Sequence, residues 1–136
     1  MTTVMPRLER RSVLTGAALT IGLAVPPAVI GVALSEDDSM AGSPWVPLLF
    51  AWIVAAFFLG GFLAARSQAY APLAHGALAA LVGFALVQAV GVVRHLVSGE
   101  GVAWLSIAFA ALLASSIGTL GGIVANSLRV RRSSAA

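Results

Sequence analysis

The chain has 136 residues, of which 60% are hydrophobic and 10% are charged, and its formal net charge is +3. Soluble domains average about 45–50% apolar and about 25% charged residues, and intrinsic disorder requires low hydrophobicity, so this composition excludes both classes. The absence of cysteine excludes disulfide scaffolds, thiolate metal sites and cysteine nucleophiles. We therefore predict an integral membrane protein whose first partner is the lipid bilayer.

Four apolar stretches are each long enough for a helix to cross a bilayer, which takes roughly 20 residues. They run over residues 13–34, 45–65, 72–97 and 102–128. The connections between them are short, so consecutive helices should run antiparallel. We predict an all-α membrane protein with a single transmembrane domain (13–128), an antiparallel bundle of four transmembrane helices, between a basic N-terminal segment (1–12) and a basic tail (129–136).

The first stretch follows a pair of arginines, Arg10 and Arg11, which resembles the start of a twin-arginine export signal. A cleaved signal would release a soluble protein, whereas three further apolar stretches follow here, so we interpret this segment as an uncleaved first helix. Pro26 and Pro27 fall inside it, where proline removes a backbone donor and clashes with the preceding turn. They predict a kink, either a hinge that lines a cavity or, as we favour, a static bend packed against neighbouring helices.

Small residues recur at helical spacing in the apolar stretches and predict close contacts between helices. In lipid no hydrophobic force drives helices together, so their association depends on close backbone approach. Gly118 and Gly122 have the four-residue spacing of small-residue dimer interfaces. We favour packing within one chain for the second and third stretches, and leave packing and a homo-oligomer interface both open for the fourth. The predicted helix-packing residues are Gly60, Gly61, Gly76, Gly83, Ala114, Gly118 and Gly122.

Polar side chains are rare within the apolar stretches, and polar groups inside a membrane point to function because they are costly to bury. Gln88 is the one strongly polar side chain deep in the third stretch. An interhelical hydrogen bond explains it more simply than a substrate does, and serine and threonine hydroxyls can bond to a carbonyl of their own helix. The residues that would form such bonds, or alternatively line a polar path, are Gln88, Ser115, Ser116, Thr119 and Asn126.

Three ionisable residues follow near the end of the third stretch: Arg94, His95 and Glu100. A free histidine titrates near pH 6.5, so this cluster supports the hypothesis of a sensor of external pH. A solvated cluster at the membrane interface explains the same residues, and we favour that interpretation.

Motifs for enzymatic chemistry, cofactors and metals do not occur in the sequence. None of the apolar stretches has a central carboxylate for acid–base work. The acidic run Glu36–Asp37–Asp38 lacks the spaced oxygen ligands of a cation site. No basic stripe with interleaved aromatic residues is present either, so we predict no catalytic activity, no cofactor, no metal and no nucleic-acid partner.

The arginines predict the orientation of the chain. Basic residues are enriched on the cytoplasmic side of membrane proteins, and four spans place both chain ends and the second connection on the same side. The predicted cytoplasmic anchors are Arg7, Arg10, Arg11, Arg66, Arg129, Arg131 and Arg132, whereas four of the five carboxylates and Arg94 fall on the opposite side. Trp45 and Trp104 begin two stretches on that opposite side, where interfacial aromatic residues belong. We predict a multi-pass protein of the bacterial inner (cytoplasmic) membrane with both termini in the cytoplasm (N-in/C-in).

Two segments resemble a known group of proteins. GGFLAARSQAYAPLAHGALAALVGF (60–84) and IGTLGGIVA (117–125) resemble the YrzE-like group of small four-helix bacterial membrane proteins, whose function is unknown. The resemblance implies the four-helix architecture and no particular activity. The matching positions are Gly60, Gly61, Arg66, His75, Gly76, Gly121 and Gly122.

Three hypotheses of function follow from these residues. The first is a non-catalytic membrane protein that acts through helix packing, as a homo-oligomer or as a subunit or accessory of a larger membrane complex. The second is an oligomeric channel or transporter for a small neutral or weakly charged solute. The third is a membrane sensor of external pH that uses His95 and Glu100.

Overall fold

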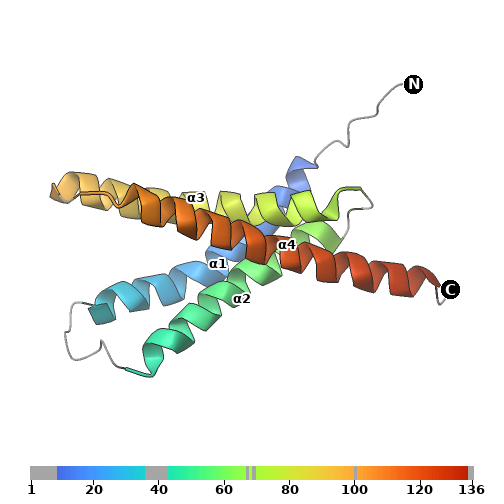
Figure 1. The fold of residues 1–136 in the computed structure, drawn as a ribbon, viewed down its shortest axis with the longest axis horizontal. Coiled ribbons are helices and arrows are strands. Elements are labelled where there is room, and N and C mark those ends of the chain that lie inside the picture. The colour runs from blue at the N-terminus through green and yellow to red at the C-terminus, as the bar shows by residue number, and fades with distance from the viewer. Residues whose placement is uncertain (1–8, 36–42, 67, 69, 100, 135–136) are drawn as a thin grey trace.

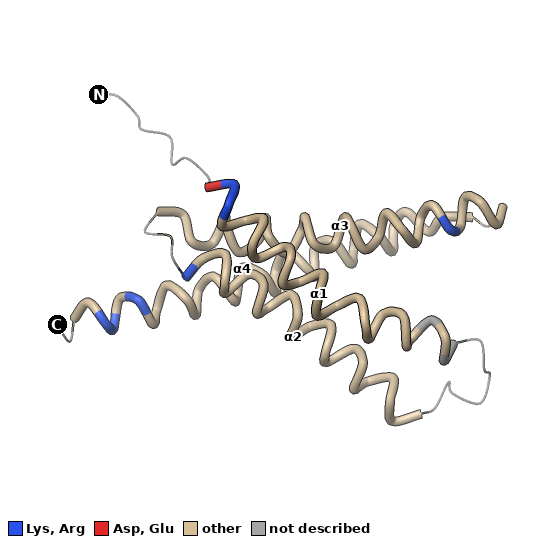
Figure 2. The backbone as a smooth tube through the Cα atoms, turned by 180° about the vertical axis from the view of Figure 1, so that it is seen from behind, with Lys and Arg blue, Asp and Glu red and all other residues tan. Residues whose placement is uncertain are grey.

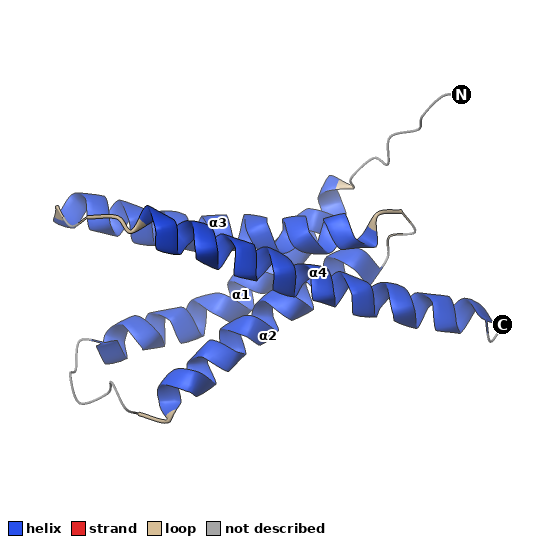
Figure 3. Cartoon of the chain, in the orientation of Figure 1, coloured by secondary structure: helices blue, strands red, loops and turns tan. Residues whose placement is uncertain are grey.

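The computed structural model describes residues 9–35, 43–66, 68, 70–99 and 101–134. They form α1 (Arg10–Ser35), α2 (Trp45–Arg66), α3 (Pro72–Ser98) and α4 (Trp104–Ser134), and this part of the chain contains no strand (Figures 1 and 3). Each helix is long and apolar enough to cross a membrane, which confirms the prediction of an all-α membrane protein with four helices. Arg7, the acidic run 36–38 and Glu100 lie outside the described residues.

The helices extend beyond the predicted stretches at the basic ends. α1 begins at Arg10 and α4 continues to Ser134, so the described part of the predicted basic tail is helical. Serine hydroxyls in this last part donate back to carbonyls of the same helix: Ser133 to Arg129 and Ser134 to Val130. α1 runs as one helix through Pro26 and Pro27, and the kink at these residues stays a prediction.

The four helices form two helical hairpins that cross each other (Figure 1). α1 and α2 form one hairpin, and α3 and α4 form the other. α1 lies against α3 and α2 lies against α4, while α2 and α3 also meet through the middle of the crossing. The helices paired between the two hairpins, α1 with α3 and α2 with α4, therefore run in the same direction.

Within residues 9–31, 33, 43–66, 68, 70–99 and 101–134, all buried residues lie in one part of each helix, namely residues 16–27, 56–65, 75–83 and 114–125. We call these four segments the crossing region. Its buried residues are small: alanines and glycines make up most of them, with Thr20, Pro27, Phe57 and His75 as the larger ones. Small side chains allow the helix axes to approach closely, which is how helices associate in lipid.

Larger apolar side chains pack at one edge of the crossing region. Phe57, Ala80 and Ala114 form a buried cluster, and partly buried Phe84 packs against it. The rings of Phe57 and Phe84 have centroids 6.3 Å apart at an interplanar angle of 50°, a tilted arrangement that aromatic pairs prefer. This cluster joins α2, α3 and α4.

Beyond that edge the two hairpins diverge (Figure 3). We call the segments 28–35, 45–55, 84–98 and 104–113 the distal halves of the helices. In these segments, residues 28–31, 33, 45–55, 84–98 and 104–113 are half-buried or exposed. Many of their large apolar side chains are exposed, among them Phe50, Trp52, Val90, Leu105 and Phe109.

Candidate functional site

A cluster of polar side chains lies at the end of the molecule opposite the distal halves. It combines the start of α1, the connection between α2 and α3, the start of α3 and the last part of α4. We call it the polar junction, and its members are Glu9, Ser12, Gln68, His75, Asn126 and Arg129.

His75 is the buried centre of the polar junction, with 1% of its surface exposed. Its Nε2 accepts a hydrogen bond from the backbone N–H of Glu9 at 3.0 Å, and its Nδ1 lies 2.9 Å from the carbonyl oxygen of Ala71. An imidazole that accepts at Nε2 can donate through Nδ1 to the carbonyl oxygen that faces it. The side chain therefore ties the start of α1 to the start of α3.

The start of α3 has an unusual backbone that positions this histidine. Ala71 precedes the helix with φ 48° and ψ 49°, in the left-handed region, and Pro72 occupies the first turn. The Ala71 carbonyl also accepts the backbone N–H of His75 at 3.2 Å. One carbonyl oxygen thus receives both the backbone and the imidazole N–H of His75.

Gln68 connects the other members of the polar junction. Its side-chain amide donates to the Glu9 carboxylate and, at 2.6 Å, to the hydroxyl of Ser12. Arg129 donates through Nη1 to the backbone carbonyl of Gln68 at 2.5 Å and through Nη2 to Asn126 Oδ1 at 2.8 Å. All four helices are consequently linked at this end by hydrogen bonds.

The predicted helix-packing residues all lie buried in the crossing region. A methyl group added to Gly118 would lie 2.5 Å from Ala80 Cβ and 2.5 Å from the Gly76 carbonyl oxygen. Gly61 of α2 faces the carbonyl oxygen of Gly118 itself. Gly60 and Gly83 both face Thr20 of α1. The small-residue row of α4, for which an oligomer interface was the alternative, therefore faces helices of its own chain.

Gly122 and Ala114 complete this set on α4. A methyl group on Gly122 would approach the Pro72 carbonyl oxygen to 2.8 Å, at the start of α3. Ala114 belongs to the apolar cluster with Phe57 and Ala80. The contacts of the α4 row, from Ala114 to Gly122, thus extend along about two turns of the helix.

The residues predicted for interhelical hydrogen bonds or a polar path have separate surroundings. Ser116 donates to the Leu112 carbonyl and Thr119 to the Ser115 carbonyl, both within α4 and both at 2.8 Å. Ser115 and Gln88 are half-buried, and Asn126 belongs to the polar junction. Among the described residues, no buried side-chain nitrogen or oxygen lacks a hydrogen-bond partner.

The predicted sensor cluster lies at the other end of α3. Arg94 and His95 are exposed there, and the carbonyl of Arg94 accepts the hydroxyl of Ser98. Glu100 lies outside the described residues. Within the described chain, no group of three or more histidines, cysteines and carboxylates is placed to hold a metal ion.

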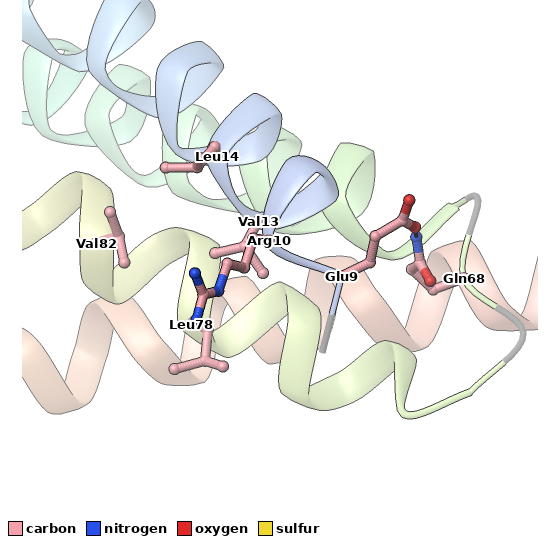
Figure 4. A pocket seen from close by; sticks show the side chains of 7 residues that line it. All are labelled: Glu9, Arg10, Val13, Leu14, Gln68, Leu78 and Val82. Atoms are coloured by element: carbon pink, nitrogen blue, oxygen red, sulfur yellow. Dashed lines mark hydrogen bonds between the residues drawn. The ribbon is translucent and has the colours of Figure 1, made fainter. Parts of the chain in front are cut away.

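An open groove lies beside the polar junction, between α1 and α3, and has a volume of about 1130 Å³ (Figure 4). Its walls are the apolar side chains of Val13 and Leu14 from α1 and of Leu78 and Val82 from α3. Glu9, Arg10 and Gln68 line it as well, so its polar residues belong to the start of α1 and the following connection.

Thr20, Gln68 and Ser12 were not predicted from the sequence, and His75 was named only as a position that matches the resemblance. A threonine in an apolar helix or a glutamine in a connection carries no distinguishing signal in one sequence. The signal for His75 was present, because a histidine four residues after an alanine–proline pair can bond back to the carbonyl that opens the helix.

No family model matches the chain, and neither a curated protein nor a solved structure matches it. The resemblance to the YrzE-like group stays a prediction.

Proposed function

We propose that the chain is a non-catalytic membrane protein that acts through helix packing, as a homo-oligomer or as a subunit of a larger membrane complex. We further propose that the distal halves of its helices form the packing surface. The crossing region holds the chain together and leaves these segments for a partner.

The observation that carries this proposal is that no residue among 28–31, 33, 45–55, 84–98 and 104–113 is buried. The small-residue faces of all four helices are already used in the crossing region within one chain. The distal halves instead expose large apolar residues, including Trp52 and Phe109, which are 51% and 63% exposed. Exposed apolar surface in a membrane protein meets either lipid or another protein, and aromatic side chains are enriched where proteins bind each other.

The distribution of charge supports an orientation for the proposed protein. Figure 2 shows the arginines of the α1 start, the α2 end and the α4 end at one end of the molecule, and Arg94 at the other. By the positive-inside tendency, we propose that the polar junction faces the cytoplasm of a bacterial cell and that both termini lie on that side. The distal halves would then lie toward the outer leaflet.

The test is the intact mass of the complex, purified in mild detergent from the membrane in which it is expressed. We expect a mass above that of the 13.8 kDa chain. Replacing both Leu105 and Leu112 by alanine should shift the complex toward the monomer, because these side chains are 86% and 68% exposed on the distal half of α4. Loss of a well-packed interface side chain costs about 1 kcal/mol or more.

The matched control replaces Leu120 and Leu128 by alanine. Both leucines lie on the same helix and are exposed, but outside its distal half. The control should keep the mass of the complex. A monomer for the unmodified chain, or equal effects of the two double variants, would reject the proposal.

A further inference from the structure

The groove between α1 and α3 contains a cation that the fold does not use. The side chain of Arg10 extends from α1 toward α3, with its guanidinium near Leu78 (Figure 4). Within the described chain, this guanidinium has neither a hydrogen-bond partner nor an ion-pair partner. A guanidinium presents five donors in a planar fork that matches phosphate geometry.

The neighbouring carboxylate does not neutralise this cation. Glu9 turns toward the connection between α2 and α3, where the amide of Gln68 and the hydroxyl of Ser12 donate to it. Arg11 follows on the same turn and is exposed. The charged residues at this end of the groove therefore leave a net positive charge.

The walls of the groove fit a long apolar group. Val13 and Leu14 face Leu78 and Val82 across it, on two helices that are each long enough to cross a membrane. The volume of about 1130 Å³ lies above the range of roughly 300–1,000 Å³ that is typical of small-molecule pockets. Because the groove is open along the sides of these helices, its occupant can enter from the bilayer.

We propose that this groove binds one anionic phospholipid, with its phosphate on Arg10 and an acyl chain along the walls from Val13 to Val82. A neutral apolar ligand would leave the guanidinium without an anion. A soluble anion would leave the apolar walls uncovered. A lipid with a negatively charged headgroup satisfies both parts of the groove, and this site does not depend on the oligomeric state of the chain.

The test is a lipid titration of the purified, delipidated full-length chain, followed by native mass spectrometry. The probes are phosphatidylglycerol and phosphatidylcholine with identical acyl chains. The unmodified chain should retain phosphatidylglycerol more tightly. Arg10→Gln should weaken its binding about tenfold or more, since the variant loses a hydrogen bond to a charged group, and Arg10→Lys should keep the preference for the anionic lipid.

Two further variants separate the groove from general attraction of anions to arginine. Arg132→Gln removes an exposed cation of α4 outside the groove and should leave lipid binding unchanged. Val82→Trp fills the groove and should weaken the binding of both lipids. The proposal is overturned if the two lipids bind equally, if Arg132→Gln and Arg10→Gln lose the same affinity, if Val82→Trp has no effect, or if glycerol phosphate competes and thereby identifies a site for soluble anions.

Discussion

Gly118 of α4 lies directly against Gly76 of α3: a methyl group on Gly118 would come within 2.5 Å of the Gly76 carbonyl oxygen. On the other side of Gly118, its own carbonyl oxygen faces Gly61 of α2. Three helices therefore meet at three glycines, where any side chain would separate their backbones. This contact sets the position at which the two hairpins cross.

Gly118→Ala is expected to destabilise the chain by about 2 kcal/mol, because backbone and Ala80 must move to admit the methyl group. The matched control is Gly91→Ala, since a methyl group at Gly91 meets no atom within 4 Å. Alanine favours helix over glycine by about 1 kcal/mol, so the control should be neutral or stabilising. Thermal unfolding in detergent measures both, and equal unfolding temperatures would contradict the proposed crossing contact.

His75→Ala should loosen the start of α1, because the Glu9 N–H loses its acceptor Nε2 and the Ala71 carbonyl keeps only the backbone N–H of residue 75. The expected loss in the free energy of unfolding is about 1 kcal/mol. Hydrogen exchange at residues 9–13 should accelerate. His95→Ala on the same helix changes an exposed histidine and should leave that exchange unchanged.

Arg129→Gln should release the connection between α2 and α3, because Arg129 donates to the Gln68 carbonyl and to Asn126. Both hydrogen bonds are only part-buried, so we expect the free energy of unfolding to fall by about 1 kcal/mol. Faster proteolysis or hydrogen exchange at residues 66–71 is the measurement. Arg131→Gln, which changes an exposed arginine two residues later, is the control; equal effects would show that the charge alone matters.

Ala71→Gly is expected to stabilise the chain by about 0.5 kcal/mol. Alanine in the left-handed region is strained by roughly 1–2 kcal/mol, and the lower entropy of the unfolded alanine chain offsets part of that strain. Ala74→Gly is the matched control, since Ala74 is an exposed helical residue. That variant should lower the free energy of unfolding by about 1 kcal/mol. An Ala71→Gly variant that unfolds at a lower temperature would contradict the strained cap.

The four helices could be predicted from the sequence because composition alone determines them. Long apolar runs between polar connections have one stable backbone conformation in lipid, the helix. The observed helix bounds differ from the predicted ones mainly at Arg10 and Ser134. Charged and small polar residues continue α1 and α4 there, beyond the ends of the apolar stretches.

The crossing of the hairpins and the polar junction could not be predicted in the same way. Glycine rows show that helices approach closely, but Gly118 fits a partner helix of its own chain or of a second copy equally well. The link between Glu9 and His75 joins residues 66 positions apart, and nothing local to either residue specifies the other. The crossing of the hairpins depends on contacts between glycines and alanines that are far apart in the sequence. These residues have no functional groups that would specify their partners.

The most direct test of the account places a photo-crosslinking amino acid at single exposed positions of the full-length chain in its native membrane. Val90 and Leu112 report on the distal halves, whereas Leu14 and Leu128 report on exposed apolar positions outside them. We predict protein adducts of fixed mass from Val90 and Leu112, and lipid adducts alone from Leu14 and Leu128. Lipid adducts alone from all four positions would contradict a function based on packing through the distal halves.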